Sequence, residues 1–278
     1  MTNPTMIQID KLRPFEGHPY KVLDNEEMND LIGSIQDNGI LSPLIVRPLE
    51  GTDEYEVISG HRRLYAAQRA GMNAVPALIY PISRDEAAVL LVDSNLHREY
   101  ILPSEKAFAY RLKMEALDRR GKRCGQVGHK SRDDVSETES GRTVQRYIRL
   151  TYLIPALLDL MDEGRMAFSV GVELSYLDRA AQEYLADLIE RDECTPSYSQ
   201  AVRMHRCCMG LAVISDDQIE SIMAEEKPNQ REQIKFRRDE LDQYFPRYYT
   251  DRQIRQDILA GLDLLKRQRE RNRDRDAR

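Results

Sequence analysis

The feature that most constrains this chain is a four-residue turn, Gly60-His61-Arg62-Arg63, between a strand-like run at 55–59 and a helix-like run at 64–71. Glycine lets the backbone turn sharply and approach a ligand closely. The start of a helix offers unpaired N–H groups and the positive end of its dipole, which together bind anions. Two adjacent arginines add donors that match phosphate oxygens. The turn therefore predicts a phosphate site, although a solvated arginine pair explains the motif alone about as well.

The first hundred residues alternate strand and helix patterns. Residues 26–38 carry apolar side chains at helical spacing and end at Gly39, and a capping-box pattern at Ser83 begins another helix. We therefore expect an α+β domain over residues 1–100. Four short apolar runs predict its strands: 6–9, 44–46, 55–58 and 75–80.

From Pro103 onward the strand patterns stop and helix patterns follow one another to the C-terminus. Two short helices, one from Ser131 and one from about Gly141, suit a helix-turn-helix. We expect an all-α helix-turn-helix domain over residues 101–192 and a helical C-terminal region with a basic tail over residues 193–278. Residues 121–129 are predicted to form a loop, and residues 227–230 a linker.

Composition narrows the possible functions. The net charge of −6 and the pI of about 5.6 argue against a protein that coats nucleic acid everywhere, but basic residues gather between 111 and 149. The chain shows neither an apolar run that could span a bilayer nor a signal peptide, which predicts a cytoplasmic location. The four cysteines lack the paired spacing of a zinc site, and no carboxylate cluster indicates a nuclease.

Several blocks in a fixed order resemble those of the ParB family of DNA-partition proteins, whose N-terminal domain is related to sulfiredoxin. The resemblance covers roughly the first two thirds of the chain. The blocks that carry it are Ser34-Ile35, 39–48, 55–67, Val75-Pro76, 94–99, 103–110 and 144–150.

The resemblance implies a CTP site in the N-terminal domain. The loop that would face the cytosine comprises Gly39, Ile40, Leu41, Ser42 and Pro43. The turn that would hold the phosphates comprises Gly60, His61, Arg62 and Arg63. Asn95 and Arg98 match a second phosphate motif, in which the Asn95 amide oxygen would ligate Mg²⁺.

Two residues depart from the family pattern. His61 and Ser94 stand where the family has glutamates near the metal and the hydrolytic machinery. We therefore expect at most a slow CTP hydrolase; the alternative is a domain that keeps the fold and binds no nucleotide. Sulfiredoxin chemistry needs a cysteine beside the phosphate turn, whereas the first cysteine of this chain is Cys124.

The segment from Ser140 to Leu150 reads as a recognition helix, with Val144 and Ile148 facing inward. Arginine and glutamine are the side chains that read guanine and adenine edges in the major groove. The alternative is a charged, solvated face on a structural helix. The side chains expected to project outward are Arg142, Gln145, Arg146 and Arg149. The predicted DNA-binding residues are Ser140, Gly141, Arg142, Thr143, Gln145, Arg146 and Arg149.

The resemblance implies a sequence-specific DNA-binding protein of chromosome, plasmid or mobile-element partition. It would be a nucleoid-associated homodimer that acts as a CTP-dependent clamp on double-stranded DNA. The alternative is a helix-turn-helix transcriptional regulator with a silent nucleotide-binding domain. A partner ATPase of this family usually engages a basic N-terminal segment, but Met1–Asp10 contains no basic residue, which favours the alternative slightly.

Overall fold

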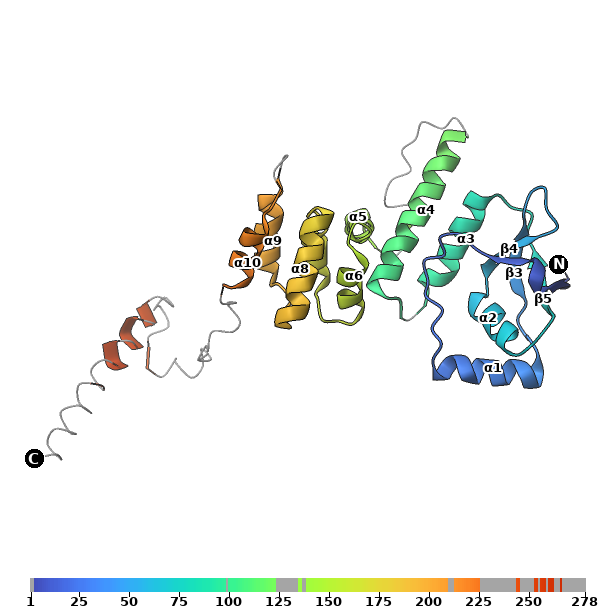
Figure 1. Cartoon of the computed structure of the whole chain (residues 1–278), viewed down its shortest axis with the longest axis horizontal. Coiled ribbons are helices and arrows are strands. Elements are labelled where there is room, and N and C mark those ends of the chain that lie inside the picture. Colours follow the sequence, from blue (N-terminus) through green and yellow to red (C-terminus); the bar gives the residue numbers. More distant parts are fainter. Residues whose placement is uncertain are drawn as a thin grey trace, which may run out of the picture. The chain divides into compact units, whose positions relative to one another are not determined.

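The computed structural model describes residues 3–98, 100–123, 135–136, 139–209 and 213–225, and farther on residues 244–245, 253–254, 256–258, 260–262 and 266. For residues 121–123 it describes the backbone only. The chain falls into two compact units, residues 1–225 and residues 226–278. The strands and helices labelled in Figure 1 belong to the first unit.

A five-stranded mixed sheet, in the order β1-β5-β3-β4-β2, forms the centre of the N-terminal part. β3 pairs antiparallel with β4 and parallel with β5; β1 pairs antiparallel with β5, and β2 parallel with β4. Leu44, Val46 and Val57 are fully buried in one apolar cluster, and Ile58, which follows Val57, is fully buried in another on the opposite face. The strands are β1 (Thr5–Gln8), β2 (Leu12–Pro14), β3 (Leu44–Pro48), β4 (Tyr55–Ser59) and β5 (Ala74–Ile79).

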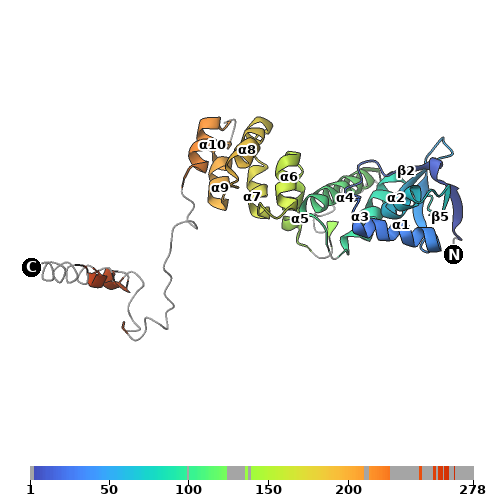
Figure 2. The ribbon, with the colours of Figure 1, turned by 60° about the horizontal axis from the view of Figure 1, so that its bottom comes forward.

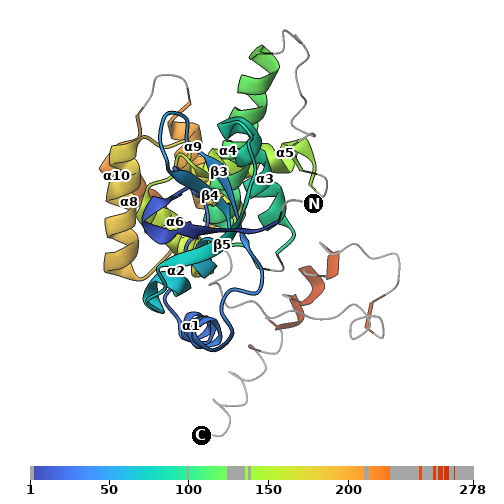
Figure 3. The ribbon, with the colours of Figure 1, turned by 90° about the vertical axis from the view of Figure 1, so that its right-hand side faces the viewer.

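Helices cover both faces of this sheet, as Figure 3 shows. α2 (His61–Arg69) packs Leu64 onto one face, and α1 (Glu26–Asn38) lies against α2. α3 (Arg84–Leu96) and α4 (Pro103–Arg123) pack together on the side of Ile58. The predicted α+β fold is therefore confirmed.

Local signals account for the ends of two of these helices. The side chain of Asn25 accepts a hydrogen bond from the backbone N–H of Met28 at the start of α1, and the helix ends at Gly39, whose φ is +68°. At the start of α3, Ser83 and Glu86 form the predicted capping box. The positions of both helices are thus determined by residues next to them in the sequence.

The remainder of the first unit is helical, and its helices pack on one apolar cluster (Figure 2). The cluster includes the fully buried side chains of Leu150, Leu157, Leu174 and Leu185. Its helices are α5 (Gly141–Leu150), α6 (Pro155–Asp162), α7 (Phe168–Leu174), α8 (Arg179–Asp192), α9 (Tyr198–Cys207) and α10 (Asp216–Met223).

Three observations bear on the sequence predictions. The predicted loop at 121–129 is wrong at its beginning, because α4 continues through Arg123; a glycine inside a helix costs only about 1 kcal/mol. β2 and the short 3-10 turn at Ile9–Lys11 were not predicted. Most of the helix predicted from Ser131, the linker at 227–230 and most of the predicted basic tail lie outside the described residues.

Among the described residues, no helix combines the length and the apolar character needed to cross a membrane. In the same residues, no three side chains of histidine, cysteine, aspartate or glutamate gather into a metal-binding group. The predicted domain boundaries near residues 100 and 192 remain predictions.

Candidate functional site

The turn at Gly60 has a geometry that only glycine adopts without strain. Its φ of +104° lies in the left-handed region, and a Cβ added there would sit 3.0 Å from Cγ of Leu44. The carbonyl of Gly60 accepts the first hydrogen bond of α2 from Leu64, at 2.9 Å. Strand β4 therefore passes into α2 through one residue, and the helix start faces the space above the sheet.

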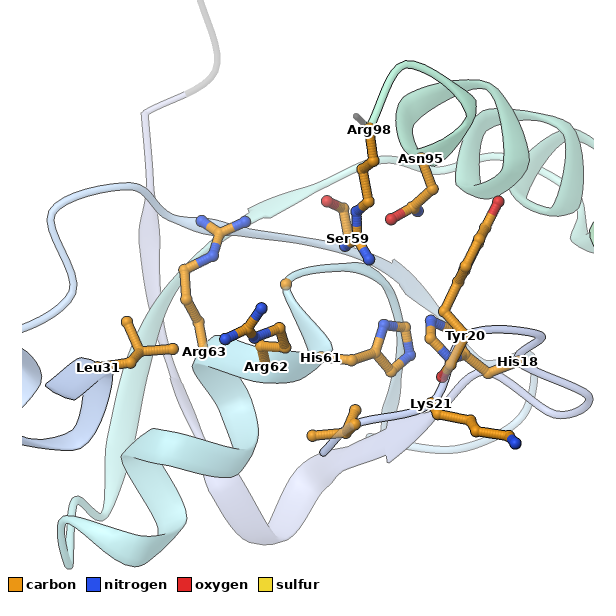
Figure 4. Close-up of a pocket in the computed structure, with 12 residues that line it drawn as sticks. His18, Tyr20, Lys21, Leu31, Ser59, His61, Arg62, Arg63, Asn95 and Arg98 are labelled. Atoms are coloured by element: carbon orange, nitrogen blue, oxygen red, sulfur yellow. The ribbon is translucent and has the colours of Figure 1, made fainter. Parts of the chain in front are cut away.

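A cavity of about 220 Å³ lies at this helix start (Figure 4). Four cationic side chains line it: Lys21, Arg62, Arg63 and Arg98. None of the described residues that line it is a carboxylate. A hollow with several positive charges and a helix N-terminus is built for an anion. The other lining residues are His18, Tyr20, Val22, Leu31, Ser59, Gly60, His61 and Asn95.

The two arginines of the turn have different partners. Arg63 donates through Nη1 to the carbonyl oxygens of Ser42 and Pro43, the latter at 3.0 Å. Burial lowers the pKa of Arg63 from its usual value. Arg62 forms an ion pair with Glu27, an exposed carboxylate, at 3.2 Å. An exposed pair of this kind contributes little, so Arg62 can exchange Glu27 for a phosphate at small cost.

The predicted loop from Gly39 to Pro43 lies beside the turn but does not line the described cavity. Its last two residues meet the turn through the bonds to Arg63. Leu41 is 84% exposed, whereas Ile40 packs partly against the apolar clusters of the sheet and α1. The sequence did not indicate that only the end of this loop contacts the turn.

Asn95 and Arg98 reach the cavity from the end of α3. Asn95 is buried, and its amide nitrogen donates to the carbonyl of Leu91 at 2.7 Å. The guanidinium of Arg98 lies 5.4 Å from the ring centroid of Tyr20. The structure therefore brings both predicted residues to the same cavity as the turn. Ser94 does not line it and instead donates its hydroxyl back to Leu91 at 3.0 Å.

Two histidines form part of the cavity wall. The ring centroids of His18 and His61 are 3.7 Å apart. Burial, together with the neighbouring His18 and Arg98, lowers the pKa of His61 to about 3. The pKa of His18 is also lowered, chiefly by burial. The segment from His18 to Val22 was missed by sequence reasoning, because nothing in its local pattern indicates that it meets a turn forty residues away.

The predicted recognition helix is present as α5. The Ser140 hydroxyl caps the helix by accepting from the backbone N–H of Thr143, at 3.3 Å. Arg142 and Arg146 are exposed, Gln145 is half-buried, and Val144 is fully buried. The helix therefore turns its apolar side inward and presents basic and amide side chains to solvent, as a DNA-reading helix would.

Arg149 departs from the prediction that it projects outward. It is half-buried, and its guanidinium donates to the backbone carbonyl of Ser175 at 2.7 Å and to the Ser175 hydroxyl at 3.1 Å. The same guanidinium lies 4.0 Å from the ring centroid of Tyr176 and 4.5 Å from that of Tyr152. Ser175 directly follows α7, so these contacts hold α5 against the end of α7.

Comparison with known proteins shows which family the chain resembles. Residues 1–96 match the family model of the ParB N-terminal domain. A probable chromosome-partitioning protein ParB from Coxiella burnetii is 28% identical over 183 residues, which cover 66% of this chain and 59% of the relative. ParB from Caulobacter vibrioides is 36% identical over 123 residues, 43% of this chain and 40% of the relative.

A nucleoid occlusion protein from Listeria monocytogenes is 34% identical over 112 residues, 40% of this chain and 39% of the relative. The chain thus spans about half the length of the curated relatives it matches. Among solved structures, a truncated Caulobacter crescentus ParB complexed to the centromeric parS site shares 22% identity, over 73% of this chain and 98% of that one, with a TM-score of 0.43. Residues 1–96 thus match a ParB N-terminal domain, and the chain is similar in sequence to ParB chromosome-partitioning proteins.

Proposed function

We propose that this chain is a ParB-like DNA-partition protein that binds double-stranded DNA in a sequence-specific way and binds CTP. One observation carries the nucleotide part: four cations and the N-terminus of α2 converge on a cavity whose described lining contains no carboxylate. A triphosphate supplies the charge that this arrangement lacks. The preference for cytosine rests on the resemblance of the loop from Gly39 to Pro43.

The DNA part rests on α5. Arg142, Gln145 and Arg146 lie on its accessible side, and its first turn is capped by a hydroxyl that also suits phosphate contact. Nucleoid association, a homodimer and closure as a clamp belong to the same proposal, as does the division into domains near residues 100 and 192.

A second candidate is a transcriptional regulator with the same DNA-binding helices and a silent nucleotide-binding domain. The bonds that the two arginines of the turn make within the protein favour this candidate: Arg62 pairs with Glu27, and Arg63 donates to two carbonyl oxygens. In that case these bonds would simply complete the fold, and no ligand would be needed to satisfy the arginines.

DNA recovery and sequencing, with and without CTP, separates the two candidates. A partition clamp should enrich DNA around a few sites and spread outward from them only when CTP is present. A regulator should give narrow peaks that CTP does not change. Arg62→Ala should abolish the CTP-dependent spreading and keep the narrow peaks; spreading that survives this substitution would contradict the nucleotide proposal.

We further propose that hydrolysis of CTP is slow. A carboxylate positioned as a general base typically contributes about 10²–10⁴-fold to a rate, and this chain has His61 and Ser94 where the family places glutamates. Phosphate release with cognate DNA should therefore be weak, and Ser94→Glu should raise it. Release as fast as in relatives that carry both glutamates would show that other residues supply the base.

A further inference from the structure

Two adjacent imidazoles, tilted by 39° to each other, line the cavity beside the arginines of the proposed phosphate site. His18 lies in the segment after β2 and His61 at the start of α2, and Figure 4 shows the two rings side by side. His61 belongs to the predicted phosphate turn, whereas His18 has no role in the proposed function so far. The hydrogen bonds of the two rings indicate which of them can respond to an anion.

Backbone partners determine where each neutral ring carries its proton. Nδ1 of His18 lies 2.8 Å from the carbonyl oxygen of Tyr20, which can only accept, so Nδ1 carries the proton and Nε2 has a free lone pair. Nε2 of His61 accepts from the backbone N–H of Phe15 at 3.4 Å, so the proton of His61 is on Nδ1. Among the described residues, Nε2 of His18 has no hydrogen-bond partner.

Four cationic side chains line the cavity that holds the pair: Arg62 and Arg63 from α2, Arg98 from the end of α3, and Lys21 from the segment of His18. Of these, Arg98 acts most directly on the two rings, because it contributes to the lowered pKa of each. Four carboxylates bond to residues that line this cavity: Glu27 of α1 pairs with Arg62, Asp159 and Asp162 of α6 pair with the ammonium of Lys21, and Glu105 of α4 accepts from the backbone N–H of Lys21 at 2.7 Å. Burial and this positive surrounding keep both rings uncharged when the cavity holds no anion, which agrees with the lowered pKa of each.

We propose that His18 is a further phosphate-binding residue of this cavity and that its Nε2 takes up a proton when an anion binds. The proposal rests on the proposed function, because the anion is the triphosphate of CTP. A bare lone pair repels a phosphate oxygen, whereas a protonated Nε2 donates a charge-assisted hydrogen bond to it. His61 cannot do the same, since protonation of its Nε2 would set two donors, N–H of Phe15 and N–H of the ring, against each other.

The direction of the pH dependence follows. A bound phosphate offsets the field of the arginines, so binding raises the pKa of His18 from its lowered value in the free protein. The bound state then holds more protons than the free state at any pH between these two values. Affinity should increase as the pH falls through that interval, and should be level above the pKa of the bound form.

Calorimetric titration of the full chain with CTP, from pH 6 to pH 8 and in two buffers of different ionisation enthalpy, measures the affinity and the protons taken up. The triphosphate itself gains a proton near pH 6, so the informative quantity is the difference between the wild type and His18→Gln. Gln keeps a donor at the place of Nε2 but does not titrate. The control is His97→Gln, an exposed histidine outside the cavity.

We expect the wild type and His97→Gln to take up protons in excess of His18→Gln and to bind CTP more tightly at pH 6 than at pH 8. The gain is about tenfold for each unit by which the pKa of His18 rises on binding. His18→Phe, which keeps an aromatic ring beside His61, should lose the excess uptake as well, and thermal denaturation identifies any variant that fails to fold. Equal uptake in the wild type and both His18 variants would overturn the proposal.

Inorganic triphosphate, titrated in the same way, separates this inference from the function on which it rests. If it binds with uptake that depends on His18 while CTP does not bind, the anion site stands and the CTP assignment fails. If CTP binds and uptake does not depend on His18, the CTP assignment stands and the role of His18 is wrong. If neither compound binds, both are wrong.

Discussion

The first turns of α2 and α5 both carry arginines, and the surroundings of these arginines differ. α2 begins at a glycine with φ of +104°, and its arginines border a cavity shared with Lys21 and Arg98 (Figure 4). α5 begins at a serine cap, and Arg142 and Arg146 are exposed. An arginine at a helix start therefore says little about the ligand by itself. The shape around it decides: a hollow suits a small anion, and an open helix suits the surface of a duplex.

Arg62→Ala should have the largest effect that distinguishes the start of α2 from the start of α5. Removing a charge-assisted hydrogen bond of about 1.5–3 kcal/mol should weaken CTP binding about 10- to 100-fold, measured by calorimetry, and leave binding to a short DNA duplex unchanged. Arg69→Ala, an exposed arginine in the last turn of the same helix that does not line the cavity, is the matched control. An equal loss in both variants would mean that the start of α2 has no special part in binding.

Gln145→Ala and Arg146→Ala, on α5, should have the opposite pattern: they should weaken DNA binding and leave CTP binding unchanged. Losing a contact to a base edge should cost about 1–3 kcal/mol on the cognate duplex and little on a scrambled one, with CTP affinity unaffected. Fluorescence anisotropy over a salt series measures both duplexes. Arg165→Ala, outside α5 and exposed, is the control. If the variants weaken both duplexes alike, α5 contacts phosphates and does not read sequence.

A smaller effect should separate Arg149 from its neighbours on α5. Because its guanidinium bonds to Ser175 and lies on two tyrosine rings, Arg149→Ala should lower the free energy of unfolding by about 1–2 kcal/mol. Arg142→Ala should leave it nearly unchanged. Denaturation in urea measures both. If the Arg149→Ala protein is as stable as the wild type and its DNA binding depends less on salt, Arg149 contacts DNA phosphates and does not stabilise the fold.

The smallest expected effect is the pH dependence of stability from His61. The unfolded chain takes up this proton near pH 6.5, whereas the folded protein resists it until about pH 3. The stabilisation is therefore present above pH 6.5 and is lost as the pH falls below it, by at most about 1.4 kcal/mol per unit. His61→Phe should show a shallower decline between pH 6.5 and pH 5, measured by urea denaturation. An unchanged slope would mean that the proton is accommodated in the folded state.

The parts of the fold that could be predicted are those determined by near neighbours. The cap at Asn25, the stop at Gly39 and the capping box at Ser83 each lie within one helical turn of what they determine. β2 could not be predicted, because a run of three residues has no periodicity of its own and is a strand only through its pairing with β4.

The same distinction holds for the candidate sites. Helical spacing placed Arg142, Arg146 and Arg149 on one face, but it could not show that Ser175 and Tyr176 reach the last of them. The arginine turn was visible as a motif, whereas His18 and Tyr20 join it only through the folding of a segment with no marked pattern. Contacts between distant segments thus decided which predicted residues are free to bind a ligand.

The apolar cluster on the α3 side of the sheet has a consequence for how this protein can exchange parts with its relatives. Ala109 and Ala116 of α4 are fully buried in the same cluster as Phe15 and Ile58. A recombination event that joined a foreign partner at residue 100 would divide this cluster and expose its apolar side chains on both pieces. A crossover beyond α4 would divide a second cluster, in which Tyr110 and Leu117 of α4 pack with Val144 of α5. Because α4 belongs to the apolar clusters on both of its sides, neither crossover leaves a piece with an intact core.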